Sequence, residues 1–177
     1  MTVQTRKLCL TAVGIALFVA LTMCLQVPVF ENYYLCLGYV VMAVYLSFFG
    51  ITSGTVVGCF GVILYCLITN GLRGMPGWLA GNLVIGLLLG IAFRATRKDG
   101  RRWRKTIVQA AAVVVAVGLG ILVMKSMTES LLYAQPFPVR VGKNSYAFAA
   151  DVAVLLIGLP ICSALERPVG RMFPDLM

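Results

Sequence analysis

Six apolar runs follow one another along this chain of 177 residues, and they restrict the folds open to it. A helix needs about 20 residues to cross the roughly 30 Å of hydrocarbon in a bilayer. The runs cover residues 8–27, 35–49, 53–69, 76–93, 107–127 and 146–165. The second and third are short, and the turn between them carries no charge. The second and third runs therefore predict a helical hairpin that is tilted in the membrane or partly covered by a partner protein.

Composition agrees with a membrane protein. Hydrophobic residues make up 60% of the chain and charged residues only 12%, whereas soluble domains have about 25% charged residues. We therefore predict an all-α membrane protein, a compact bundle of six transmembrane helices that forms a single domain over residues 1–177. The first run follows Arg6 and Lys7, as in a signal peptide. Its length and the lack of a small-residue cleavage site predict a retained helix instead.

The basic residues predict the orientation of the bundle. Seven of the fifteen lie within residues 94–105, between the fourth and fifth runs. Arg6 and Lys7 precede the first run, and Arg167 and Arg171 follow the last. With six helices, all three groups fall on one side of the membrane. Because positive loops stay in the cytoplasm, we predict cytoplasmic N and C termini. The orientation of the protein in the membrane then explains most of the net charge of +9, and the sequence does not indicate nucleic-acid binding.

The opposite, outer side carries segments of another kind, at residues 28–34, 70–77 and 128–145, the last being the longest. They combine aromatic rings, amides and a few charges, as small-molecule pockets do. An interfacial belt of aromatic residues would give a similar pattern. Two charges, Lys125 and Asp151, fall within helices, where they form an ion pair or mark a functional site. The candidate binding residues are Tyr33, Tyr34, Arg73, Trp78, Asn82, Arg140, Asn144, Tyr146 and Asp151.

Several kinds of chemistry have no motif in the sequence. The chain has no histidine, and none of its six cysteines forms a CxxC pair, so a metal site is not indicated. A GxxxxGK[ST] loop for ATP is absent, as are a serine elbow and paired catalytic carboxylates. We therefore expect a binding subunit and not an enzyme, with its energy supplied by other proteins.

Small residues recur at helical spacing. Ala12, Ala16 and Ala20 form a stripe on the first predicted helix. Small side chains let helices approach closely in lipid, so this stripe either packs inside the bundle or contacts a partner. The glycines of the third and fourth helices repeat the spacing, and we expect them to pack inside the bundle.

These features together resemble a known family. The glycine-marked second run, the short glycine hairpin, the glycine-rich fourth helix and the alanine stripe appear in the order typical of S-components. These are the substrate-binding membrane subunits of bacterial energy-coupling factor (ECF) vitamin transporters. The segments that carry the resemblance are LGY at 37–39, FG at 49–50, SGTVVG at 53–58, GW at 77–78, GN at 81–82 and IG at 85–86.

The resemblance implies a multi-pass protein of the bacterial cytoplasmic membrane that captures a vitamin at the extracellular side. It implies docking through Ala12, Ala16 and Ala20 on an EcfT-type transmembrane coupling protein. Two cytoplasmic EcfA-type ATPases would use ATP and Mg, the chain would have no cofactor of its own, and the bundle would topple to carry its ligand inward. We favour cobalamin as the ligand, with pantothenate, riboflavin and folate as alternatives. A structural or regulatory subunit that transports nothing is the alternative of another class.

Overall fold

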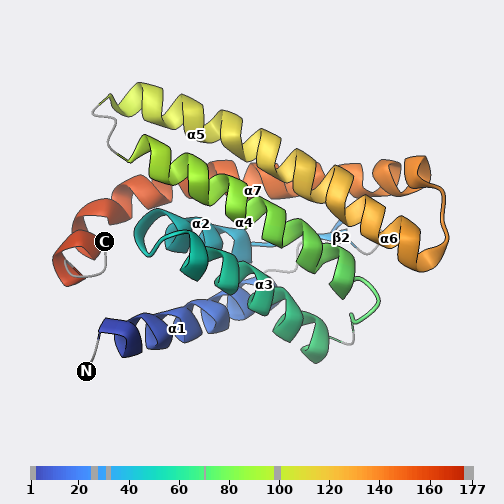
Figure 1. Ribbon diagram of the computed structural model, residues 1–177, viewed down its shortest axis with the longest axis horizontal. Helices are drawn as coiled ribbons and strands as arrows, with labels where there is room; N and C mark the ends of the chain where they lie inside the picture. Colours follow the sequence, from blue (N-terminus) through green and yellow to red (C-terminus); the bar gives the residue numbers. More distant parts are fainter. Residues whose placement is uncertain (1–2, 25–27, 31–32, 70, 98–100, 174–177) are drawn as a thin grey trace.

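The computed structural model describes residues 3–24, 28–30, 33–69, 71–97 and 101–173, and for residues 3, 28–30, 33, 34 and 102 it describes the backbone alone. In these ranges the elements are α1 (Val3–Cys24), β1 (Pro28–Phe30), β2 (Tyr33–Tyr34), α2 (Gly38–Phe48), α3 (Ile51–Ile68), α4 (Met75–Thr96), α5 (Arg102–Val117), the π-helix η1 (Gly118–Lys125), α6 (Ser126–Tyr133) and α7 (Phe137–Met172). Because α5, η1 and α6 run on without a break, these described elements form six helical rods (Figure 1).

The predicted six-helix bundle agrees with this arrangement. Five rods are long and apolar enough to cross a membrane: Gln4–Cys24, Ile51–Ile68, Met75–Thr96, Trp103–Tyr133 and Phe137–Met172. The sixth, α2, has only 11 residues, or about 16 Å of helix. Eight of those residues are buried, so the rest of the bundle shelters this short helix.

Two features of the connections differ from the sequence-based predictions. β1 (residues 28–30) and β2 (residues 33–34) pair as a small antiparallel ribbon, which the sequence analysis did not predict. The long outer loop predicted at residues 128–145 was wrong, because α6 and α7 occupy most of it. Ala134 ends α6 in the left-handed conformation, with φ 50°. Pro138 then lies in the first turn of α7, where a missing N–H costs no hydrogen bond.

Glycines let the helices approach one another, as predicted. A Cβ atom on Gly54 would lie 2.5 Å from the Leu46 side chain, and one on Gly58 would lie 2.5 Å from Met42 Sδ. On Gly81 it would lie 2.9 Å from the carbonyl oxygen of Gly120. The backbone of α4 therefore packs directly on the backbone of η1.

Helix α1 has one face in the bundle and one outside it. Phe18 and Thr22 are buried and pack against Gly38 of α2. The three alanines of the predicted stripe lie on the other side and are all exposed: Ala12, Ala16 and Ala20.

The ends of the bundle differ in charge. In Figure 1, α1 begins and α7 ends at the same end of the bundle, on the left, where α4 also leads to α5. The basic groups of the sequence thus gather at that end. The α3–α4 and α6–α7 connections lie at the other end. The structure contains no membrane, so the cytoplasmic location of the termini stays a prediction.

Candidate functional site

A cavity of about 710 Å³ lies at the end of the bundle that is formed by the α3–α4 and α6–α7 connections. Its lining comes from α1, the segment before α2, α3, the α3–α4 connection, α4, η1, α6 and α7. The lining residues are Thr22, Cys36, Tyr65, Cys66, Thr69, Gly71, Arg73, Gly74, Trp78, Lys125, Glu129, Tyr133, Arg140, Ala147 and Asp151. Pockets of about 300–1,000 Å³ are typical for small-molecule ligands.

One wall of the cavity is aromatic. The rings of Tyr65 and Trp78 pack edge to face, with centroids 5.7 Å apart and planes at 79°. Tyr133 of α6 also lines the cavity. Flat apolar groups of a ligand can stack on such rings, or meet their edges.

A buried hydrogen-bond network fixes Trp78 in this wall. Its Nε1 donates to the Tyr39 hydroxyl over 2.9 Å, and that hydroxyl donates to Asn82 Oδ1 over 2.6 Å. Asn82 Nδ2 in turn donates to the carbonyl of Gly58 over 2.9 Å. Tyr39 and Asn82 are fully buried. The network joins α2, α3 and α4 beside the cavity, and satisfied buried networks of this kind make a site rigid.

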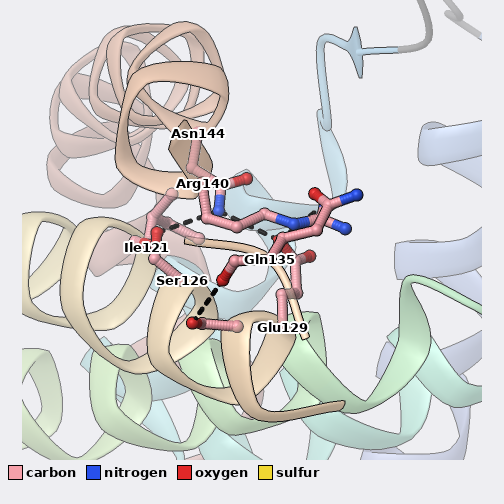
Figure 2. Close-up of polar contacts among 7 residues, drawn as sticks. Ile121, Ser126, Glu129, Gln135, Arg140 and Asn144 are labelled. Atoms are coloured by element: carbon pink, nitrogen blue, oxygen red, sulfur yellow. Dashed lines mark hydrogen bonds and ion pairs between the residues drawn. The ribbon is translucent and has the colours of Figure 1, made fainter. Parts of the chain in front are cut away.

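A second network holds a buried carboxylate at the cavity (Figure 2). Glu129 is only 4% exposed, and its Oε2 accepts from Asn144 Nδ2 over 3.1 Å. Arg140 Nη1 lies 3.4 Å from the same oxygen. Asn144 also donates to the Ser126 hydroxyl over 3.0 Å. The α6 and α7 helices are thereby joined through largely buried polar groups beside the cavity.

Charges of both signs face the cavity. The described lining residues include three cations, Arg73, Lys125 and Arg140, and two carboxylates, Glu129 and Asp151. Asp151 is 5% exposed and Lys125 is 9% exposed. Both are thus largely buried at the cavity. The formal charges of these five groups sum to plus one.

The structure brings four of the predicted binding residues to the cavity: Arg73, Trp78, Arg140 and Asp151. Two others are fully buried beside it. Asn82 accepts a hydrogen bond from Tyr39, which in turn holds the lining residue Trp78. Asn144 donates to the lining residue Glu129. Tyr146 is 44% exposed and does not line the cavity. The side chains of Tyr33 and Tyr34 lie outside the described part of the structure.

Sequence reasoning did not name Glu129 and Tyr133 as binding residues, because it treated residues 128–145 as a loop, and it named Lys125 only as a charge within a helix. Lys125, Glu129 and Tyr133 are spaced by four, so a helix through them puts all three on one face. Arg140 and Asp151 are eleven residues apart, or about three helical turns, so they also lie on one face of α7. With the helices recognised, this spacing would have predicted both charged faces.

The comparisons with known proteins identify the family. The family described as "ECF-type riboflavin transporter, S component" matches residues 2–167. No curated protein matches the chain, and no solved structure matches it. The matched family covers nearly the whole chain, including every lining residue of the cavity. The chain therefore belongs to the S-components of ECF transporters, and it is a multi-pass protein of the bacterial cytoplasmic membrane that serves as a substrate-binding subunit for vitamin transport and not as an enzyme.

Proposed function

We propose that this S-component captures a vitamin from outside the cell in the 710 Å³ cavity. An EcfT-type coupling protein and two EcfA-type ATPases, which use ATP and Mg, then drive delivery inward. The observation that carries the proposal is that the α3–α4 connection and α6 line the cavity. These elements lie at the end of the bundle opposite the one where α4 leads to α5 (Figure 1). Basic residues flank this α4–α5 connection, and the positive-inside rule assigns it to the cytoplasm. The cavity then faces the medium.

Cavity size favours a vitamin no larger than about riboflavin. Cobalamin was the ligand favoured from the sequence, since its corrin suits aromatic and amide partners. A corrin that carries a nucleotide is larger than the drug-sized ligands held by cavities of about 300–1,000 Å³, so much of it would remain outside. A flat ring system such as that of riboflavin fits against Tyr65 and Trp78, which meet edge to face.

The two tryptophans of the chain provide a direct test of binding. Trp78 lines the cavity, whereas Trp103 is 79% exposed near the start of α5. Purified protein is titrated with riboflavin, pantothenate, folate and cobalamin while tryptophan fluorescence is recorded. In the Trp103→Phe variant, the ligand should quench the emission of Trp78. In the Trp78→Phe variant, the change should be much smaller.

Calorimetry on the unmodified protein provides the control for optical artefacts. If no vitamin binds while the chain still copurifies with the coupling protein, it is a structural or regulatory subunit and the proposal is wrong. Equal quenching in both tryptophan variants would place the ligand away from this cavity.

Asn144 should matter for ligand binding although it does not line the cavity. Asn144→Ala removes the hydrogen bonds to Glu129 and Ser126 and leaves a buried carboxylate poorly satisfied, at a cost of about 1–3 kcal/mol. We expect a lower melting temperature and weaker vitamin binding, measured by thermal unfolding in detergent and by calorimetry. Ser145→Ala is the control, because Ser145 is exposed and bonds locally to the Gly142 carbonyl. Unchanged affinity in Asn144→Ala would show that Glu129 needs no positioning.

A further inference from the structure

Two arginines from distant parts of the chain converge on one tyrosine of the cavity. The Cζ atom of Arg73, in the α3–α4 connection, lies 5.1 Å from the centroid of the Tyr133 ring. The Cζ atom of Arg140, in α7, lies 5.2 Å from the same centroid. Both side chains line the cavity. Two like charges held near one ring repel each other, and the repulsion is stronger where water is partly excluded.

Arg140 makes little use of its hydrogen-bonding capacity. A guanidinium has five N–H donors in a planar fork. In the part of the chain that the structure describes, the Nε atom of Arg140 is buried without a hydrogen-bond partner. Its Nη1 is 3.4 Å from Glu129, beyond the usual 2.7–3.2 Å. The protein thus holds a guanidinium at the cavity and satisfies it poorly.

The excess positive charge lies at the outer part of the cavity. Asp151 follows Arg140 by eleven residues on α7, which is about 16 Å along the helix axis. The carboxylate of Glu129 is shared between Arg140 and Asn144. Within the described part of the chain, neither Glu129 nor Asp151 forms an ion pair with Arg73, which is exposed and contacts the Tyr133 ring. One positive charge therefore remains at Arg73 and Arg140.

We propose that the vitamin carries one anionic group, a carboxylate or a phosphate, that binds between Arg73 and Arg140 while its apolar part meets Tyr65 and Trp78. The proposal rests on the vitamin-binding role proposed above and narrows it to a class of substrate. Arginine forks match both anions with paired, charge-assisted hydrogen bonds. An anion there also relieves the repulsion between the two arginines and gives the buried Nε an acceptor after a small side-chain movement.

The test uses two pairs of probes that differ mainly in the anionic group. Riboflavin 5′-phosphate is compared with riboflavin, and pantothenate with its alcohol, panthenol. Affinities are measured by calorimetry on the purified full chain, at low and high salt. In at least one pair, the anionic member should bind about tenfold more tightly or better, as expected for a charge-assisted hydrogen bond. Its affinity should fall as salt rises.

Variants locate the anion. Arg73→Gln should weaken the anionic member about tenfold and leave its neutral partner nearly unchanged. Arg73 is exposed and contacts the Tyr133 ring, so this variant should fold. Lys143→Gln is the matched control, because Lys143 is an exposed cation of α7 that does not line the cavity. It should leave both affinities unchanged.

Other outcomes overturn the inference in distinguishable ways. If the neutral probe of each pair binds as tightly as the anionic probe, the vitamin-binding role stands, but the inference that the vitamin is anionic is wrong. If Arg73→Gln weakens the affinity for the anionic and the neutral probe equally, Arg73 shapes the site and does not bind an anion. If the preference for the anion disappears in vesicles that contain phosphatidylglycerol, the arginines bind lipid phosphate instead. If neither probe pair binds but a different vitamin does, Arg73→Gln is tested with that vitamin, and an unchanged affinity overturns the inference. If no vitamin binds at all, both proposals fail.

Discussion

Replacing Gly81 with leucine should separate α4 from η1 and cost the protein both stability and ligand affinity. A Cβ atom at this position would lie 2.9 Å from the carbonyl oxygen of Gly120. A backbone atom cannot rotate away as the end of a side chain can. We therefore expect a loss of about 3 kcal/mol or more in the free energy of unfolding, at the upper end for overpacked cores.

The loss of affinity follows from what η1 carries. Lys125 is the last residue of this π-helix and lines the cavity, and Glu129 and Tyr133 follow on the same face. A shift of η1 moves these side chains together, so binding should weaken by at least about tenfold, or 1.4 kcal/mol. Thermal unfolding in detergent measures the first effect, and calorimetry with whichever vitamin binds in the fluorescence titration measures the second.

Gly142→Leu is the matched control for this prediction. A Cβ atom on Gly142 meets nothing within 4 Å, and leucine favours a helix over glycine by roughly 0.5–1 kcal/mol. This variant should keep the affinity and the melting temperature, or raise the latter slightly. If Gly81→Leu behaved like Gly142→Leu, the close approach of α4 and η1 would not exist in the folded protein.

The rods of the bundle could be predicted from the sequence because membrane helices are encoded locally. Apolar runs and basic flanks indicate each span, and no distant contact is needed to recognise them. The ends of the helices are harder to predict. The segment at residues 128–145 is polar and contains Pro136 and Pro138, which resembles a loop. Both prolines lie at the start of α7, where a helix tolerates them. Polar residues and prolines therefore did not show where the helices end outside the hydrocarbon.

The cavity could be predicted only in part, because its residues meet through tertiary packing. Arg73, Trp78, Arg140 and Asp151 stand out as polar or aromatic residues beside apolar runs. Tyr65 and Cys66, by contrast, look like ordinary helix residues in the sequence, and only the position of α3 next to α4 brings them to the cavity. The role of Asn82 also depends on Tyr39, 43 residues away. Single-sequence patterns contain no information on such pairs.

Replacing Ala16 with leucine should strongly reduce uptake and leave ligand binding intact. Ala12, Ala16 and Ala20 lie on the exposed side of α1, opposite the face where Phe18 packs against Gly61. A larger side chain at position 16 therefore adds bulk outside the bundle and disturbs nothing within it. Contacts between membrane helices depend on close approach through small residues. An overpacked contact costs about 1–3 kcal/mol, which corresponds to roughly five- to hundredfold weaker docking.

Uptake of labelled vitamin into proteoliposomes that contain the coupling protein and both ATPases measures this effect, with calorimetry on the isolated chain as the parallel readout. Ala111→Leu is the control, since Ala111 is an exposed alanine of another helix, α5, and should leave uptake unchanged. Ala16→Gly keeps the side chain small and should also preserve uptake. Equal loss of binding and uptake in Ala16→Leu would mean that Ala16 supports the fold. Normal uptake would mean that the coupling protein docks elsewhere, because a face that accepts leucine without loss is not one where two helices come close together.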